Sequence, residues 1–266
     1  MKLSPREILF ALSYQNKGEW KKILQDLKEK KPLSKEDIDY CHRVCRNTYL
    51  SLLDEEYPSY FKEITHPPFL LYYYGNISLL HHPHKLSVVG TRKPTLYQND
   101  TVYQLIQKVE EKTNCQTCIV SGMAQGIDQA SLKAARDRNA PIIAVIGSGI
   151  DNPYPRENDG LYEYCKGSNG LILSEYPGNC NAKRDNFIFR NRLIVALSEI
   201  LFVGGGKLHS GTSSSANLAL DYNKEILALP CNISGDDLTN VLIRDGATSV
   251  LDENDILSAL KAQAEK

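Results

Sequence analysis

The stretch DNFIFRNRLIVALSEILFVGGG, Asp185–Gly206, contains a basic segment, an apolar helix pattern and a strand-like run in direct succession. Leu193 and Leu197 lie one helical turn apart on the same face, which predicts a helix over Asn191–Ser198. The run that follows, Ile200–Gly204, is continuously apolar, as is typical of parallel strands buried on both faces. A helix that leads directly into such a strand and a glycine-rich turn indicates an α/β sheet.

The same alternation continues through most of the chain. It predicts the fold class α/β, with a Rossmann-like, doubly wound and mostly parallel sheet. The predicted strands are Leu86–Gly90, Cys118–Gly122, Ile142–Gly147, Leu171–Glu175, Ile200–Gly204 and a run centred on Leu227 that ends at Pro230. The predicted helices between them are Asn99–Lys112, Gln129–Arg138, Glu157–Lys166, Asn191–Ser198 and Ser213–Tyr222.

The first part of the chain has a different pattern. Apolar residues recur at helical spacing over Pro5–Tyr14, Trp20–Glu29 and Lys35–Cys45. A proline-containing segment follows and leads into a short aromatic strand that ends at a Gly-Asn turn. We therefore expect two domains, a small helical domain over residues 1–56 and an extended Rossmann-like domain over residues 57–266.

Composition places the chain among ordinary globular proteins of the cytoplasm. No apolar run approaches the roughly 20 residues of a membrane span, and the start of the chain lacks the features of a signal peptide. The seven cysteines are an odd number and widely scattered, which argues against a disulfide framework. Cys115 and Cys118 have CxxC spacing, but no second pair completes a zinc site. We expect no metal and no cofactor.

Positive charge is concentrated just before the helix pattern. From Lys183 to Arg192 there are four cations and one acid, in a chain whose formal net charge is -1. This contrast indicates a focused anion site, which we expect at the N-terminus of the predicted helix, where free backbone N–H groups also favour anions. Phe187 adds an aromatic ring, and a ligand with both phosphate and base, such as single-stranded nucleic acid, fits the combination. The alternative is that the arginines form ordinary salt bridges and Phe187 packs in the core.

Polar, cationic and glycine residues follow the ends of four predicted strands. In a doubly wound sheet, ligands bind beyond the carboxyl ends of the strands, so these residues predict a phosphate-binding surface. Simple tight turns are the alternative for each glycine cluster, and neither GxGxxG nor a Walker loop is present. The strand-end residues are Gly90 and Arg92, then Ser121, Gly122 and Gly126, then Gly147 and Gly149, and finally Lys207, Ser210 and Thr212.

Several motifs together resemble the DprA/Smf family (DNA processing protein A) over about Tyr57 to Ala247. They occur in the order SVVGTRKPT, IVSGMAQGID, AVIGSGIDNPYPREN, LILSEYP, FRNRLIVALS, SGTSSSANLAL and LIRDGA. The resemblance implies a cytoplasmic, non-enzymatic homodimer that binds single-stranded DNA and loads RecA during natural transformation. It also implies protection of incoming DNA, action alongside single-strand-binding protein, and a sterile-alpha-motif-like helical N-terminal domain. The DNA-binding residues that it implies are Gly90, Arg92, Ser121, Gly122, Arg184, Phe187, Arg190, Asn191, Arg192, Lys207 and Ser210.

The chain departs from the family pattern at three places. Many members read FPxRNR where this chain has Ile188 and Phe189 before the arginine, and Pro230-Cys231 stands where a Pro-Gly pair is familiar. The sequence also stops soon after DENDILSAL, so we expect a short form without the C-terminal winged-helix domain.

The main alternative is an enzyme, a nucleoside-monophosphate ribohydrolase of the related lonely-guy family. Its signature PGGxGTxxE supplies a glutamate for glycosidic cleavage, whereas Ser215 occupies that position here. Glu175, at the end of a predicted strand, is the other candidate acid, although a single strand-end acid is more often structural. A nucleotide-sensing module without DNA binding is a third possibility. We expect no catalytic residues.

The late apolar residues allow two interpretations. Val241, Leu242, Ile243 and the stretch Ile256–Leu260 either complete the core or form the dimer and RecA surface that the resemblance suggests.

Overall fold

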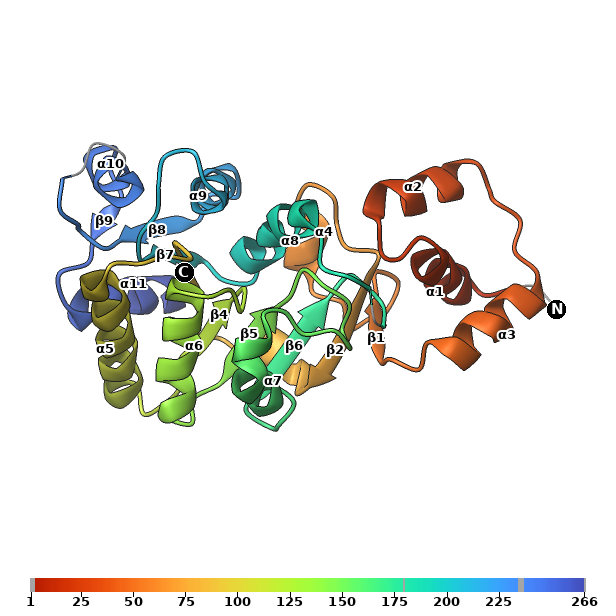
Figure 1. Ribbon diagram of the computed structural model, residues 1–266, viewed down its shortest axis with the longest axis horizontal. Helices are drawn as coiled ribbons and strands as arrows, with labels where there is room; N and C mark the ends of the chain where they lie inside the picture. Colours follow the sequence, from red (N-terminus) through yellow and green to blue (C-terminus); the bar gives the residue numbers. More distant parts are fainter. Residues whose placement is uncertain (1–2, 179, 234–236, 266) are drawn as a thin grey trace.

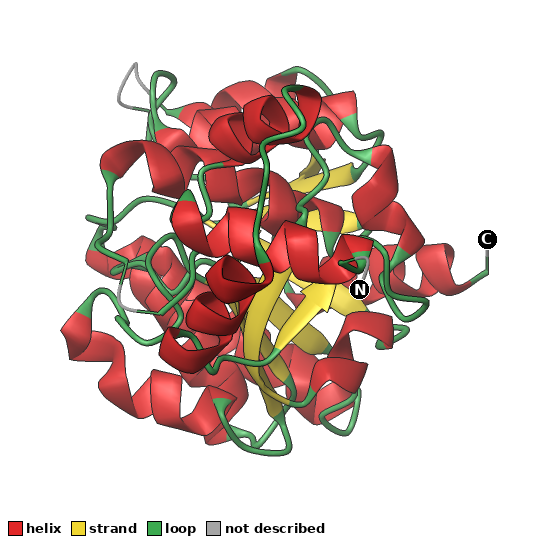
Figure 2. Ribbon diagram, turned by 90° about the vertical axis from the view of Figure 1, so that its right-hand side faces the viewer, coloured by secondary structure: helices red, strands yellow, loops and turns green. Residues whose placement is uncertain are grey.

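The computed structural model describes residues 3–178, 180–233 and 237–265. Within these residues nine strands form one sheet, with helices on both of its faces (Figures 1 and 2). The sheet order is β1-β2-β6-β5-β4-β3-β7-β8-β9, and every pairing from β6 to β9 is parallel, whereas β1–β2 and β2–β6 are antiparallel. This arrangement confirms the predicted mixed α/β fold. The strands are β1 Tyr49–Ser51, β2 Leu70–Gly75, β3 Lys85–Val89, β4 Cys118–Ser121, β5 Ile142–Val145, β6 Gly170–Ser174, β7 Ile200–Val203, β8 Glu225–Ala228 and β9 Thr248–Ser249.

The chain winds in two directions from β3. Successive strands β3, β4, β5 and β6 extend to one side, and the chain then returns to place β7, β8 and β9 on the other. The order therefore reverses between β3 and β7, which is the point where doubly wound sheets bind ligands.

Helices cover both faces, and each face has its own apolar core. Alternate strand residues such as Leu86 and Val88 contact the core under α1, α3, α5, α6, α7 and α11, whereas Val89 and Val203 contact the core under α4, α8 and α10. The α-helices are α1 Pro5–Gln15, α2 Trp20–Lys28, α3 Lys35–Val44, α4 Ser59–Glu63, α5 Leu96–Lys112, α6 Ile127–Asp137, α7 Asp159–Cys165, α8 Arg184–Ala196, α9 Gly211–Asp221, α10 Leu238–Arg244 and α11 Glu253–Ala264. Two short 3-10 helices are η1 Ile77–His81 and η2 Arg156–Asn158.

One predicted helix boundary is wrong in a way that affects the site. Helix α8 begins at Arg184, seven residues before the predicted start at Asn191. The first two turns direct the polar side chains of Asn186 and Arg190 inward, so they lack the apolar periodicity that marks a buried helix face. Arg190 and Arg192 therefore lie inside the helix, and Arg184 alone of these arginines is in its first turn.

Helices α1 to α3 lie beside the antiparallel end of the sheet (Figure 1). The hydroxyl of Tyr72 on β2 donates to Ser13 Oγ on α1 at 3.0 Å. β1, which precedes residue 57, is the outer strand of the sheet at this end. The division of the chain into domains at residue 57 stays a prediction.

The late apolar residues are buried to different degrees. Ile256 and Leu260 on α11 are buried in the core, with 0% and 8% exposure. Val241, Leu242 and Ile243 on α10 are only half-buried.

Across the described ranges, no helix has both the length and the apolar character needed to cross a membrane.

Candidate functional site: a cationic pocket at the switch point

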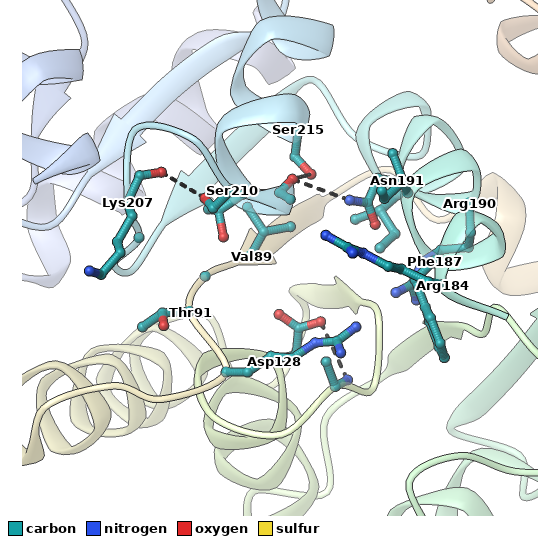
Figure 3. A pocket seen from close by; sticks show the side chains of 18 of the residues that line it. Val89, Thr91, Asp128, Arg184, Phe187, Arg190, Asn191, Lys207, Ser210 and Ser215 are labelled. Carbon is teal, nitrogen blue, oxygen red and sulfur yellow. Dashed lines mark hydrogen bonds between the residues drawn. The ribbon is translucent and has the colours of Figure 1, made fainter. Parts of the chain in front are cut away.

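A pocket of about 650 Å³ opens where the strand order reverses, beyond the carboxyl ends of β3 and β7. Its walls come from the loop after β3, the start of α6, the first half of α8 and the loop between β7 and α9. Figure 3 shows Arg184 and Phe187 on one side, Lys207 and Ser210 across from them, and Asp128 below. The position agrees with the site expected for a doubly wound sheet.

Three exposed cationic side chains from different segments line this pocket, besides the buried Arg190. Arg92 follows β3, Arg184 begins α8, and Lys207 lies in the loop after β7. All three belong to exposed residues, so their charge faces solvent at the pocket mouth. Because the segments are far apart in sequence, the positive charge is concentrated by the fold, in a chain with a formal net charge of -1.

Phe187 supplies an aromatic surface beside these cations. The Arg92 guanidinium carbon lies 5.1 Å from the centroid of the Phe187 ring, and the Tyr154 ring lies 5.7 Å away with a 44° tilt. The ring rests on Gly147, where an added Cβ would come within 2.8 Å of Phe187 Cδ1. Gly147 therefore allows the aromatic ring to pack against the end of the β5 segment, while the ring stays half-exposed to the pocket.

Arg190 anchors the floor of the pocket. Its side chain is 3% exposed, and Nη1 donates to the carbonyl oxygens of Gly122, at 2.8 Å, and Val145. A Cβ at Gly122 would lie 2.5 Å from Nη1, so only glycine leaves room for the guanidinium. Burial lowers the pKa of Arg190 to about 10, with the charge of Asp128 acting in the opposite direction.

Asp128, in the first turn of α6, holds the neighbouring loop. Its Oδ2 accepts from the backbone N–H of Gly122 at 3.1 Å and of Ala124 at 3.4 Å. Burial raises the pKa of Asp128, and the positive charge of Arg190 opposes that rise. The pocket therefore has a carboxylate beneath its exposed cations.

Arg192 points away from the pocket, into a buried ion pair with Glu175. Its two terminal nitrogens donate to Glu175 Oε2 at 2.7 Å and Oε1 at 2.6 Å, and Nε donates to the His66 carbonyl at 3.0 Å. Both side chains are at most 5% exposed. The pair joins α8 to the end of β6, and Arg192 also ties α8 to the proline-containing segment before β2, so both residues have a structural role.

Two hydroxyl or amide residues of the lining are held by backbone groups. Ser210 caps the start of α9, where its Oγ accepts from Ser213 N–H at 3.3 Å and donates to the Lys207 carbonyl at 2.7 Å. Asn191 Nδ2 donates to the Gly211 carbonyl at 3.3 Å, so α8 and α9 are fixed together at the pocket wall.

Most of the residues expected from the sequence lie together, but two do not. Ser121 is fully buried and donates to the Val88 carbonyl at 2.6 Å, and Arg192 is directed elsewhere. Gly122 lies in an adjoining small hollow next to Arg92 and Phe187. The expected residues that line the main pocket are Gly90, Arg92, Arg184, Phe187, Arg190, Asn191, Lys207 and Ser210.

Sequence reasoning missed Asp128, Tyr154 and His209, which also line the pocket. An acid in a first helical turn is common on any helix, so Asp128 had no distinguishing signal. Tyr154 is brought to Phe187 by the loop after β5, whose path the sequence does not specify. Among the described residues, no group of His, Cys, Asp or Glu side chains has the arrangement of a metal site.

Comparison with known proteins connects this geometry to one family. The sequence profile described as DNA recombination-mediator protein A matches residues 48–261. DNA processing protein DprA of Streptococcus pneumoniae is 36% identical over 210 residues, which cover 78% of this chain and 72% of that protein. The Bacillus subtilis DprA is 34% identical over 215 residues, which cover 79% of this chain and 70% of that protein.

Two solved structures share the fold. The X-ray structure of Streptococcus pneumoniae DprA matches with a TM-score of 0.78 and 28% identity, covering 97% of this chain and 98% of that one. Helicobacter pylori DprA, solved to study its single-stranded DNA binding mode, matches with a TM-score of 0.72 and 32% identity, covering 81% of this chain and 97% of that one.

Proposed function

The chain belongs to the DNA recombination-mediator protein A family, and from that premise we propose that its switch-point pocket binds single-stranded DNA. The observation that carries the proposal is the half-exposed Phe187 ring with the Arg92 guanidinium 5.1 Å from its centroid. Aromatic rings beside cations are the usual means by which proteins hold single strands, because each base has a π-face and each nucleotide a phosphate. The Helicobacter pylori relative that binds single-stranded DNA supports the same assignment.

The dimensions and charge of the pocket suit one nucleotide of a longer strand. At about 650 Å³ it falls within the range of small-molecule sites, roughly 300–1,000 Å³. We propose that a base stacks on Phe187 and that Arg92, Arg184 and Lys207 contact the adjoining phosphates. A paired base in duplex DNA is stacked between its neighbours, so it cannot reach the ring without unpairing. The proposal therefore includes a preference for single strands.

We propose a binding function without catalysis. Glycosidic hydrolysis commonly uses two carboxylates on either side of the bond. Asp128 is the acidic residue among the described lining residues, and Ser215, at the position of the ribohydrolase glutamate, donates its hydroxyl to the Gly211 carbonyl at 3.2 Å. The Asp128 carboxylate is itself engaged by two backbone N–H groups, which suits a loop-positioning role.

At the level of the pathway, we propose a cytoplasmic recombination mediator that acts as a homodimer. It would protect incoming single strands during natural transformation and load RecA onto strands coated by single-strand-binding protein. Family membership supports this role, and the half-buried apolar residues Val241 and Ile243 offer a surface for such contacts. RecA filament assembly on coated strands tests it, because a mediator accelerates assembly and a passive DNA binder does not.

Two substitutions separate stacking from charge at the pocket. Phe187→Ala should weaken binding of a labelled oligothymidylate by about 1–3 kcal/mol and leave the salt dependence unchanged, because only stacking is lost. Arg92→Met should weaken binding and reduce the slope of log K against log salt by about 0.7, the value for one phosphate contact on a single strand.

The matched control is Lys261→Met, which removes one exposed cation on α11, outside the pocket lining. It should bind like wild type. The pocket assignment fails if Phe187→Ala and Arg92→Met, both still folded by circular dichroism, bind with wild-type affinity.

A further inference from the structure

Two lysines and one glutamate meet at the rim of the pocket. Ala182 and Arg184 line the pocket, whereas Lys183 between them turns toward the start of α2. There Lys183 Nζ lies 2.8 Å from Glu19 Oε1, and Lys22 Nζ lies 2.7 Å from Glu19 Oε2. Two ammonium groups thus flank a single carboxylate, which leaves one net positive charge next to the segment that lines the pocket.

Lys17 lies two residues before Glu19, on the turn that precedes α2. Its neighbour Gly18 packs against the end of β6, where a Cβ would lie 2.2 Å from the Glu175 carbonyl oxygen. This contact fixes the turn beside the loop that leads into α8. Burial raises the pKa of the nearby Cys180 thiol, and the ammonium groups of Lys17 and Lys183 both act against that rise. Both lysines therefore lie near the same loop.

The surrounding charge favours anions over a wider area. From Lys17 to Lys31 the chain has six lysines and three acids. Among the described residues, no side chain caps the N-terminus of α8 at Lys183, so its backbone N–H groups and helix dipole add to the positive potential there. In Figure 1 the start of α2 is turned toward α8, and its other end leads away toward α3.

We propose that Lys17 and Lys22, on the helical N-terminal region, and Lys183, at the start of α8, form a phosphate track that continues the pocket. A single strand with one nucleotide in the pocket would pass over the start of α2, and its phosphates would replace Glu19 as partners of Lys22 and Lys183. The inference rests on the proposed function, because it concerns the same strand. Through Lys17 and Lys22, it assigns a DNA contact to residues that precede the Rossmann-like part of the chain.

The test compares two double variants that remove equal charge from opposite ends of α2. The track variant is Lys17→Asn with Lys22→Gln, and the control is Lys28→Gln with Lys30→Asn. Lys17 and Lys30 both have left-handed backbone, with φ of 53° and 51°, which asparagine tolerates better than most residues. Lys22 and Lys28 both lie within the helix. Circular dichroism and a thermal melt establish that each variant is folded.

The readout is the affinity for two labelled oligothymidylates, one of about 4 nucleotides and one of about 20 nucleotides. The short strand fits a pocket-sized site, and the long strand extends beyond it. For the long strand, the slope of log K against log salt should be about 1.4 shallower for the track variant than for wild type, because two phosphate contacts are lost. Raising the salt from 50 to 200 mM should therefore weaken its binding by a factor about sevenfold smaller than the factor for wild type. For the short strand, the track variant should match wild type.

The outcomes separate the track from the pocket. The track is overturned if the track variant binds the long strand with an unchanged salt slope, or if the control variant loses as much slope as the track variant. In that case Phe187→Ala would still weaken binding of both oligonucleotides. Wild-type binding by Phe187→Ala and Arg92→Met would instead overturn the proposed function. Loss of short-strand binding in a folded track variant also contradicts the track, because it would place these lysines in the pocket itself.

Discussion

Replacing Arg190 by methionine should damage the fold more than it alters direct contact with DNA. Methionine keeps much of the aliphatic volume but removes the guanidinium that donates to the Gly122 and Val145 carbonyls. It also removes the positive charge that offsets the burial of the Asp128 carboxylate. The sequence alone had suggested a phosphate contact for Arg190, whereas its 3% exposure indicates an internal anchor.

The expected loss follows from these contacts. Leaving a buried hydrogen-bonding group without its partner costs about 1–3 kcal/mol, and removing one member of a buried charged set costs about 3–5 kcal/mol. The two costs describe the same deleted group, so they overlap, and we expect about 3–5 kcal/mol in total. That is a large fraction of the roughly 5–15 kcal/mol by which domains are stable.

Urea unfolding followed by circular dichroism measures this loss. With a denaturant slope near 3 kcal/mol per molar, the midpoint of Arg190→Met should fall by about 1–2 M. Burial already raises the folded-state pKa of Asp128, and loss of Arg190 raises it further, so protonation favours the folded variant. The loss of unfolding free energy in Arg190→Met should therefore be largest above the pKa of Asp128 in the folded variant, and it should become smaller as the pH falls through that pKa.

The control for this prediction is Arg92→Met, which removes an exposed guanidinium from the same pocket. Its unfolding free energy should stay within about 0.5 kcal/mol of wild type. An Arg190→Met variant with the wild-type urea midpoint would refute the anchor role of Arg190.

Two further predictions concern the core and the assembly. Burial raises the pKa of the fully buried Glu110 to about 8. Its protonated carboxyl therefore stabilises the folded state at low pH, and this stabilisation is lost as the pH rises from about 4.5 to about 8. Glu110→Gln should remove that pH dependence, so in urea titrations the unfolding free energy of the variant relative to wild type should be up to about 3 kcal/mol higher at pH 8 than at pH 5. A homodimer would hold one strand at two pockets, so long oligonucleotides should bind far more tightly than short ones; a monomer by light scattering at tens of micromolar would exclude this bivalent binding.

The sheet was predictable because its central strands are buried on both faces. The runs that became β3 to β8 are predominantly apolar, and glycine or proline residues follow most of them, so both their type and their ends were visible. The early part of α8 was not visible, because Asn186 and Arg190 occupy its inward face. A buried polar side chain that hydrogen-bonds to backbone has no apolar signature in the sequence.

The candidate site was predictable in position but only partly in composition. Arg92 and Lys207 follow strands that flank the switch point, so topology alone places them together. Ser121 and Arg192 occupy similar places in the sequence but turn inward, to the Val88 carbonyl and to Glu175. Which way a strand-end or helix residue points depends on its neighbours in three dimensions, and Tyr154 was missed for the same reason.

Binding of single-stranded DNA by the pocket is tested most directly by competition between a single strand and a blunt duplex of the same sequence, measured over a series of salt concentrations. We expect the single strand to bind much more tightly. We also expect a slope of log K against log salt of roughly -2 to -3, as for three or four neutralised phosphates. Equal affinity for the duplex, or an affinity independent of salt, would contradict the assignment of this pocket to single-stranded DNA.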